Sequence, residues 1–257
     1  MITNIVQVLG KRTLNFLEEF GQISLLLFNI IRNIKNVPRT AKVVLHQMEH
    51  IGVNSLPLVL IIAVFTGAVA AWQAAYQLQG LAPMSILGGT TSRAIITELG
   101  PVLTGIVIAG RVGASIAAEL GTMKVTEQID ALEIMAIDPI RYLAMPRVFA
   151  SLLMMPILVI FANTIAVFGA FVVSDYFLNV TFEVFFDSVK YFFIFSDLTS
   201  GLVKAVFFGG VTALLGCHIG FRTQGGAEGV GFSTIRSFVL SATMILILDY
   251  VLWMLMF

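Results

Sequence analysis

Apolar residues in this 257-residue chain fall into long runs that contain few charges. An α-helix needs about 20 apolar residues to cross a bilayer, and five runs reach that length. We predict membrane-spanning helices at residues 53–72, 94–118, 148–173, 202–221 and 238–257. The third run has no charged residue, whereas the second contains Glu98 and Arg111. The second helix must therefore face protein or water, not lipid, at those two positions.

The composition agrees with this pattern. Apolar residues make up 58% of the chain and charged residues 12%, whereas soluble domains are about half apolar and about a quarter charged. Basic and acidic residues balance at 15 each, which argues against a nucleic-acid partner. We expect an all-α integral membrane protein that forms a single domain over residues 1–257, with its five-span region at 53–257.

The segment before the first span is predicted to lie on the membrane surface as an interfacial helix. Residues 14–31 are apolar but contain Glu18, Glu19 and Gly21, and the uninterrupted run 20–31 is too short to cross a bilayer. Basic residues suited to anionic lipid headgroups follow it, at Arg32, Lys35, Arg39 and Lys42. Residues 1–50 are therefore expected to form an interfacial amphipathic region.

The distribution of Lys and Arg predicts the topology. Most of the basic residues outside the spans lie in the N-terminal segment and in the loops 119–147 and 222–236, whereas the other side has only Arg93, Lys190 and Lys204. By the positive-inside rule, the N-terminus is cytoplasmic and the C-terminus is on the outer side. The outer loop 174–200 has an aromatic-rich stretch at 182–195, which predicts a second interfacial helix between spans three and four.

Small residues recur every four positions in two spans, so that each set lies on one helix face. The set in span two is Gly105, Ala109, Gly113, Ala117 and Gly121, and the set in span four is Gly201, Ala205, Gly209, Ala213 and Cys217. Such stripes let helix backbones approach closely inside a membrane. They predict close packing within the chain or, alternatively, the seam of a dimer.

A polar stretch at 122–138, between spans two and three, is predicted to form a cytoplasmic helix. Thr126 can cap its start, and Asp138-Pro139 ends it. Its apolar face has Val125, Ile129, Leu132 and Met135/Ala136, and its other side has Glu127, Asp130 and Glu133. About 2–8 residues are enough to join two helices. The longer linker therefore favours docking of a cytoplasmic partner over a solvated connection.

Two carboxylates within the spans need an explanation. Asp249 has no other charge in its own helix, and an isolated carboxylate in a membrane is costly, so we expect a partner for it and consider Arg111 a candidate. Glu98 near the outer end of span two either lines a cavity or is hydrated at the interface. A proton-coupled carrier or a lipid-modifying protein that uses Asp249 or Glu98 remains an alternative to the function inferred below.

Two kinds of site are not expected in this chain. It has no G-x-x-x-x-G-K-[ST] loop, so ATP must bind elsewhere. Residues His46 to His50 fit the H-x-x-E-H pattern, but a zinc site needs a third ligand and a pocket. We therefore expect neither a metal site nor a catalytic site.

Several motifs together resemble one family. They are E-L-G-P at 98–101, A-G-R-V-G at 109–113, A-E-L-G-T-M at 118–123, E-Q-I-D-A-L at 127–132, D-P at 138–139 and P-R at 146–147. With I-G-V-N-S-L-P at 51–57 and F-T-G at 65–67, they are similar to the MlaE/YrbE-type permeases of ABC phospholipid transporters. The resemblance covers residues 47–257.

The resemblance implies a non-catalytic permease in the inner membrane of a Gram-negative bacterium. It implies a homodimer whose coupling helix, at 122–138, docks on a separate MlaF-like ATPase that holds ATP and Mg²⁺, so this chain itself has no cofactor. An MlaD-like MCE protein is implied on the periplasmic side, and an MlaB-like STAS protein can accompany the ATPase. The implied substrate is glycerophospholipid, moved between the inner membrane and the MCE assembly to maintain outer-membrane lipid asymmetry.

The resemblance also implies site residues. The lipid cavity is expected between span one and the start of span two, at Leu78, Leu81 and Glu98. The contact with the ATPase is expected at Glu127, Gln128, Asp130, Leu132 and Glu133.

Overall fold

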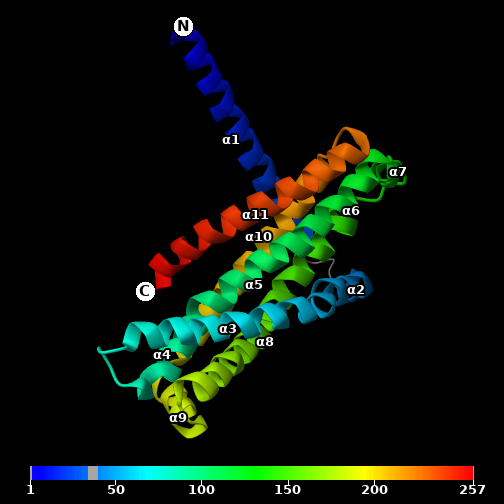
Figure 1. Ribbon diagram of the computed structural model, residues 1–257. Helices are drawn as coiled ribbons and strands as arrows, with labels where there is room; N and C mark the ends of the chain where they lie inside the picture. The colour runs from blue at the N-terminus through cyan, green and yellow to red at the C-terminus, as the bar shows by residue number, and fades with distance from the viewer. Residues whose placement is uncertain (1, 34–39, 257) are drawn as a thin grey trace.

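The computed structural model describes residues 2–33 and 40–256, and within these ranges it contains helices and no strand. Five helical stretches are long and apolar enough to cross a membrane, which confirms the predicted fold class. They are Ala41–Leu78, Met84–Val125, Ile140–Leu178, Phe195–Phe221 and Gly226–Met256. Each of these helical stretches begins before the corresponding predicted apolar run. Figure 1 shows them as a bundle of long, inclined helices.

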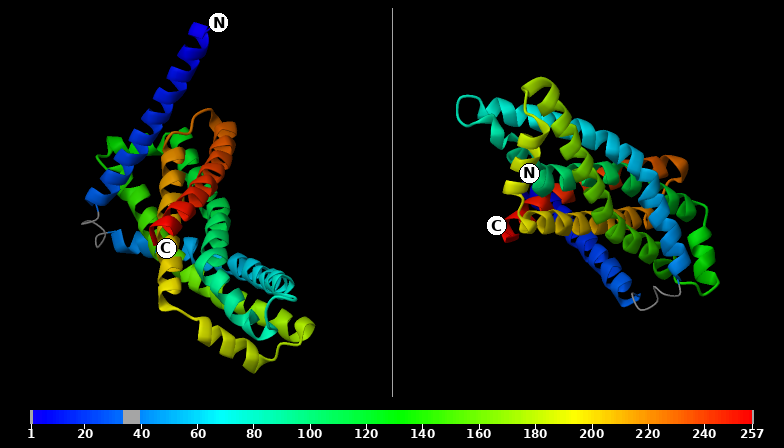
Figure 2. Two further views of the ribbon diagram at one scale, coloured as in Figure 1. Left: turned by 90° about the vertical axis from the view of Figure 1, so that its left-hand side faces the viewer. Right: turned by 90° about the horizontal axis from the view of Figure 1, so that it is seen from below.

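The N-terminal region forms two helices. Helix α1 (Ile2–Arg32) is one continuous helix of 31 residues, longer than the predicted run 20–31. Its C-terminal part packs against α10 (Phe195–Phe221) and the π segment η6 (Ile140–Ala144), while its N-terminal part extends away from the bundle (Figures 1 and 2). Lys35 and Arg39 of the predicted basic segment lie outside the described residues.

The second helix, α2 (Ala41–Ile51), belongs to the first spanning stretch and not only to the N-terminal region. It packs against α8 (Met145–Leu178) and continues through a 3₁₀ turn at Val53–Ser55 into α3 (Leu56–Leu78). Within α2, His46 and His50 are exposed. No group of three potential metal ligands occurs in the part of the chain that the structure describes.

Span two consists of α-helical pieces joined by π-helical segments. Helix α4 (Leu87–Ala94) leads through η4 (Ile95–Leu99) into α5 (Gly100–Ile108), and η5 (Ala109–Gly113) leads into α6 (Ala114–Val125). The span begins earlier than predicted, and two polar residues of the added part satisfy their hydroxyl groups locally: Thr90 donates to the Ile86 carbonyl and Ser92 to that of Gly89. Glu98 lies in η4 and Arg111 lies in η5. π segments of this kind are frequent at functional sites.

Close packing of small residues holds the bundle together. A Cβ atom added to Gly67 of α3 would lie 1.8 Å from the carbonyl oxygen of Ala166 in α8, and one added to Gly169 would lie 2.5 Å from that of Val64. The alanines and the cysteine of the two predicted stripes are completely buried within this chain, at Ala109, Ala117, Ala205, Ala213 and Cys217. The stripes therefore pack within the chain and do not form a dimer seam.

The predicted outer interfacial helix is α9 (Phe182–Phe192). It packs against α4 so closely that a Cβ atom on Gly88 would lie 2.2 Å from the Phe185 carbonyl oxygen. Phe171 of α8 contacts Phe182, Phe185 and Phe186, with ring centroids 5.4–5.7 Å apart. These aromatic contacts fix α9 across the end of the bundle (Figure 2).

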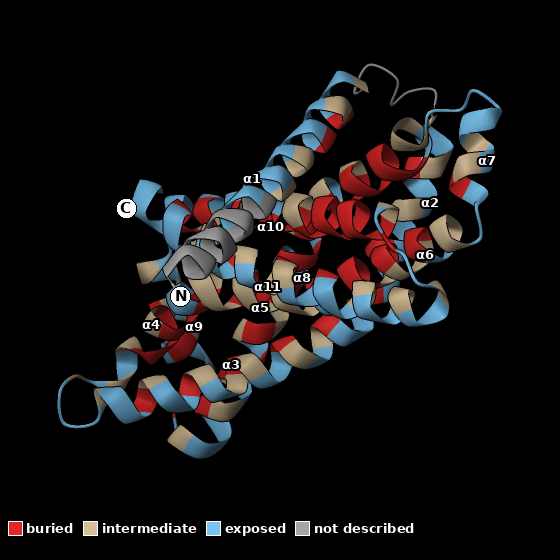
Figure 3. Ribbon diagram, turned by 90° about the horizontal axis from the view of Figure 1, so that it is seen from above, coloured by how far each residue is buried: buried red, intermediate tan, exposed pale blue. Residues whose placement is uncertain are grey.

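Burial is uneven across the spans. Buried residues concentrate on α6, α8 and α10 in the interior of the bundle (Figure 3). Helix α11 (Gly226–Met256) is the least buried span, with only 17% of its apolar window inside the chain. Its exposed residues include Leu246, Tyr250, Trp253 and Met254. An apolar face of this kind requires lipid or another protein against it.

The close approach of α3 and α8 can be tested with Gly67→Ala. The added methyl group has no space next to Ala166, so we expect the free energy of unfolding to fall by about 1–3 kcal/mol. Thermal unfolding of the purified protein in detergent measures this change. Gly231→Ala is the matched control, because nothing lies within 4 Å of its Cβ position. Equal destabilisation by both variants would show that the α3–α8 contact is not tight.

Candidate functional site

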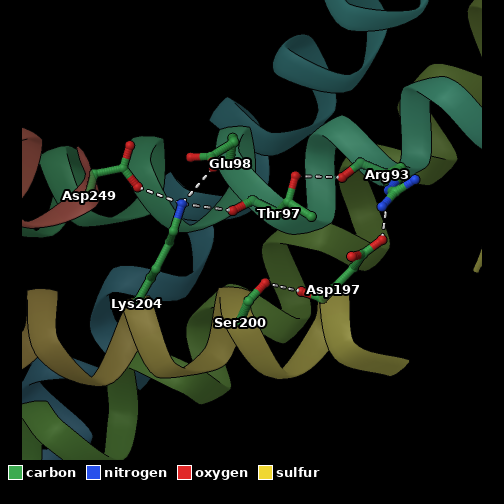
Figure 4. Close-up of polar contacts among 7 residues, drawn as sticks. All are labelled: Arg93, Thr97, Glu98, Asp197, Ser200, Lys204 and Asp249. Atoms are coloured by element: carbon green, nitrogen blue, oxygen red, sulfur yellow. Dashed lines mark hydrogen bonds and ion pairs between the residues drawn. The ribbon is translucent and has the colours of Figure 1, made fainter. Parts of the chain in front are cut away.

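A fully buried lysine occupies the centre of the candidate site. Lys204 lies one-third of the way along α10, and its side chain has no exposed surface. Its ammonium nitrogen Nζ lies 2.6 Å from Glu98 Oε1 and 2.8 Å from Asp249 Oδ1, and the Thr97 carbonyl oxygen is 3.4 Å away (Figure 4). Three acceptors thus surround an ammonium group that has three hydrogens to donate. Lys204 joins spans two, four and five.

This cluster corrects the expected partner of Asp249. The partner is Lys204 and not Arg111. The topology explains why: Glu98, Lys204 and Asp249 all lie toward the end of the bundle where α10 begins and α11 ends, whereas Arg111 lies about thirteen residues further along span two. Arg111 has one guanidinium nitrogen, Nη1, that is buried without a hydrogen-bond partner in the described residues.

The cluster has an excess negative charge, because one ammonium faces two carboxylates. A buried ion pair is stable only when its geometry and additional hydrogen bonds offset the cost of removing the charges from water. Here the lysine is completely buried, while the side chains of Glu98 and Asp249 keep 34% and 22% of their surface exposed. The carboxylates therefore form the accessible side of the cluster.

A second ion pair joins spans two and four nearer the start of α10. Arg93 Nε lies 2.8 Å from Asp197 Oδ2, and the Asp197 side chain is almost fully buried (Figure 4). The Thr97 hydroxyl donates to the Arg93 carbonyl, and the Ser200 hydroxyl donates to that of Asp197. Helix α10 can approach span two here because Gly201 has no side chain: a Cβ atom would lie 2.4 Å from the Ile96 carbonyl oxygen.

A groove of about 360 Å³ lies beside this cluster, between α3 and span two. Its lining combines apolar residues with amide and hydroxyl side chains: Ala70, Gln73, Ala74, Gln77, Leu78, Thr90, Thr91, Ala94 and Leu99. Of the three residues expected in a lipid cavity, only Leu78 lines this groove. Leu81 is 86% exposed in the connection after α3, and Glu98 contacts Lys204.

The polar segment after span two differs from the predicted continuous helix at 122–138. Helix α6 ends at Val125, Glu127 adopts a left-handed backbone conformation with φ of 60°, and α7 covers only Gln128–Ile134. Lys124 on α6 and Asp130 on α7 form an ion pair of 2.6 Å that fixes this turn.

The predicted apolar face of α7 packs inward. Ile129 is buried and Leu132 is half-buried against the chain's own core, so they are not free to contact a partner. The exposed apolar residues are Ile134, Met135 and Ile137. Glu127, Gln128 and Glu133 are exposed and Asp130 is half-exposed. The end of the bundle thus presents an apolar tip next to acidic groups.

Comparison with known proteins agrees with this architecture. The family model described as Permease MlaE matches residues 44–255. The chain belongs to the MlaE permease family. A probable ABC transporter permease protein of Rickettsia typhi is 39% identical over 100% of this chain and 99% of its own. One from Synechocystis is 42% identical over 83% of this chain and 81% of its own.

A relative with a more specific name is also similar along its whole length. The intermembrane phospholipid transport system permease protein MlaE of Haemophilus influenzae is 31% identical over 100% of this chain and 99% of its own. The family and the five apolar stretches together indicate a multi-pass inner-membrane protein that is the permease subunit of an ABC transporter. A permease of this kind implies an ATPase partner.

A further ion pair in this MlaE permease connects the segment around α7 to the bundle. Arg147 Nη2 at the start of α8 lies 3.1 Å from Glu119 Oε2 on α6, and Arg147 Nη1 donates to the Leu143 carbonyl at 2.9 Å. Ser115 donates to the other oxygen of Glu119 at 3.1 Å. Since α7 lies between α6 and α8 in the chain, this ion pair fixes both ends of the loop that carries it.

Sequence reasoning missed the role of Lys204, which it treated only as a charge on the outer side. The signal available in the sequence was the presence of opposite charges at a similar depth in three different spans. Glu98 and Asp249 are both acidic and both near the outer ends of their spans, and Lys204 is a basic residue at the start of span four. Matching charges by depth would have paired them in this MlaE permease.

The importance of the lysine can be tested with Lys204→Met. This change leaves two unpaired carboxylates within the bundle, so we expect the free energy of unfolding to fall by about 3–5 kcal/mol. The triple variant Glu98→Gln, Lys204→Met, Asp249→Asn removes all the charges and should recover most of the loss. Thermal unfolding in detergent compares the two variants. Lys190→Met is the control, since the Lys190 side chain is 79% exposed. A triple variant no more stable than Lys204→Met would show that Lys204 does not stabilise the protein by neutralising the two carboxylates.

Proposed function

We propose that this permease moves glycerophospholipid between the inner membrane and a periplasmic MCE-protein assembly. The groove between α3 and span two is the observation that carries the proposal. Its apolar part, with Ala70, Ala74 and Leu78, suits acyl chains, while Gln73, Gln77 and the two threonines provide hydrogen-bonding groups for a lipid headgroup. The Haemophilus relative, named as a phospholipid transport system permease, supports the same substrate class.

The groove is open along one side, and we propose that a second copy of the chain covers it in a homodimer. The flanking face of α3 exposes large apolar residues, among them Phe65, Val69, Trp72 and Tyr76. Such a face needs lipid or protein against it. The buried stripes of small residues are already used within the chain, so the dimer contact falls on this outer surface.

We propose that the apolar tip formed by Ile134, Met135 and Ile137 docks on an MlaF-like ATPase, which holds ATP and Mg²⁺. The exposed Glu127, Gln128 and Glu133 would surround that contact as polar groups, the usual arrangement around an apolar interface. This orientation places the N-terminus in the cytoplasm and the C-terminus in the periplasm. The end of the bundle with α9 then faces the MCE protein, and an MlaB-like STAS protein would bind the ATPase.

The alternative of proton coupling or lipid chemistry at Glu98 or Asp249 receives less support. Both carboxylates are bound to Lys204, and this pairing gives them a structural role. A transporter driven by a separate ATPase needs neither a proton site nor a nucleophile in this chain.

The groove can be tested with Ala74→Trp. The indole would fill the space between α3 and span two and obstruct the path of the lipid. We therefore expect the rate of lipid transfer to fall by about tenfold or more. The assay reconstitutes the complete transporter in liposomes and measures ATP-dependent exchange of radiolabelled phospholipid with the MCE protein. Ile160→Trp on α8 is the control, because this residue is 47% exposed and lies outside both the groove and the proposed dimer face. Undiminished transfer by Ala74→Trp would exclude the groove as the lipid path.

The docking surface can be tested with Ile134→Glu. A carboxylate in the centre of an apolar contact should reduce recovery of the ATPase by about tenfold, as loss of one central interface residue commonly does. Co-purification with the ATPase measures this loss, and the yield of inserted permease checks folding. Gln224→Glu is the control because it adds the same charge at another exposed position at this end of the bundle. Wild-type recovery of the ATPase with Ile134→Glu would contradict docking at this tip.

A further inference from the structure

A polar cavity lies where α1 crosses the end of α10 and the beginning of α11, at the opposite end of α10 from Lys204. Its volume is about 50 Å³, several times the roughly 10–15 Å³ that one water molecule requires. The polar side chains that line it are Glu19 of α1, His218 and Arg222 from the end of α10, and Ser233 and Arg236 of α11. The cavity is separate from the groove and from the Lys204 cluster.

The cavity has more donors and more positive charge than its own residues satisfy. Arg236 forms an ion pair with Glu19, whereas Arg222 forms no ion pair with any residue that the structure describes. The Ser233 and Thr223 hydroxyl oxygens lie 2.8 Å apart, and the Thr223 hydroxyl also lies 3.2 Å from the Ile219 carbonyl oxygen. Two guanidinium groups face one carboxylate, which leaves one positive charge without a counterion in the cavity.

These donors match the chemistry of a phosphate group. Arginine presents several N–H donors in a planar fork that fits phosphate oxygens, and charge-assisted hydrogen bonds of this type are strong. The Ser233 hydroxyl and the His218 imidazole line the same space and can supply further hydrogen bonds. A phosphate would also neutralise the charge that Arg222 leaves unpaired.

The depth of the cavity indicates that the phosphate belongs to a lipid. The apolar helix α10 ends at Phe221, directly before Arg222, and α11 begins at Gly226. Groups at the ends of two membrane spans lie at the level of the lipid headgroups. The neighbouring part of α1 exposes Leu17, Phe20 and Phe28, a face suited to the acyl-chain boundary.

We propose that this cavity binds the headgroup phosphate of an anionic phospholipid in the leaflet beside α1. The lipid joins α1 to α10 and α11 across the cavity. The proposal does not rest on lipid transport, since it concerns a second site at the other end of the bundle.

Native mass spectrometry of the intact transporter in detergent tests the proposal. Phosphatidylglycerol is titrated as the anionic lipid and phosphatidylcholine as the zwitterionic comparison, and inorganic phosphate is added in a third series. The variants are Arg222→Gln and Glu19→Gln. Arg141→Gln is the matched control, because it removes the same charge from a half-buried position at the same end without lining the cavity.

We expect one molecule of phosphatidylglycerol to be retained in preference to phosphatidylcholine. Arg222→Gln should weaken it by about tenfold, as loss of one charge-assisted hydrogen bond predicts, while Arg141→Gln changes binding by less than about twofold. Glu19→Gln should bind at least as well as wild type, because it removes a negative charge from the cavity. If Arg222→Gln does not fold, Arg222→Lys should give an intermediate loss, because lysine keeps the charge but not the fork.

Three results would overturn the proposal. Equal retention of phosphatidylglycerol and phosphatidylcholine would show that the unpaired charge of Arg222 does not select an anionic lipid. Equal losses in Arg222→Gln and Arg141→Gln would reflect the net charge of this end and not a site. Full competition by inorganic phosphate at the lipid's own concentration would assign the cavity to soluble phosphate.

Discussion

The buried ammonium group of Lys204 is the constraint on which the packing of spans two, four and five depends. A lysine with no exposed surface needs carboxylates within contact distance, and Glu98 and Asp249 come from two different spans. Bringing them together requires α10 to pack directly against the π segment η4. Gly201 permits that approach, because any side chain there would collide with the Ile96 carbonyl. The small residues, the π segment and the charges are therefore parts of one arrangement.

The same principle of close packing connects the two ends of the molecule. Span two runs from the groove and Glu98 at one end to α7 at the other. The part of span two that leads to α7 packs against α10 where Gly113 meets Gly216. The ion pair of Glu119 with Arg147 holds the same part to α8. The groove has α3 as its other wall, and α3 packs on α8. Helix α7 is thus connected, through α6 and α8, to the helices that form both walls of the groove.

The sequence predicted the features that depend on local composition. The five apolar runs and the aromatic helix at Phe182–Phe192 were recognisable because length, hydrophobicity and aromatic content are properties of single segments. The small-residue stripes allowed two predictions, close packing within the chain or the seam of a dimer. Only the three-dimensional packing of the helices decides between them.

Features that depend on breaks in helical geometry were not predictable from periodicity. The left-handed conformation of Glu127 breaks the predicted helix between α6 and α7. The predicted apolar face at Ile129 and Leu132 packs against the chain's own core, and Ile134 is exposed instead. The π segment at Ile95–Leu99 changes the register of span two in the same way and directs Glu98 towards Lys204 and away from the groove.

ATP-dependent transfer of phospholipid by the reconstituted wild-type transporter tests the central claim most directly. The measurement follows labelled phospholipid between liposomes that contain the permease with its ATPase and the MCE protein on the outer side. The structure predicts transfer that requires ATP hydrolysis and stops when the permease is omitted. Transfer that continues without ATP, or its absence while the bound ATPase is active, would contradict the proposed function.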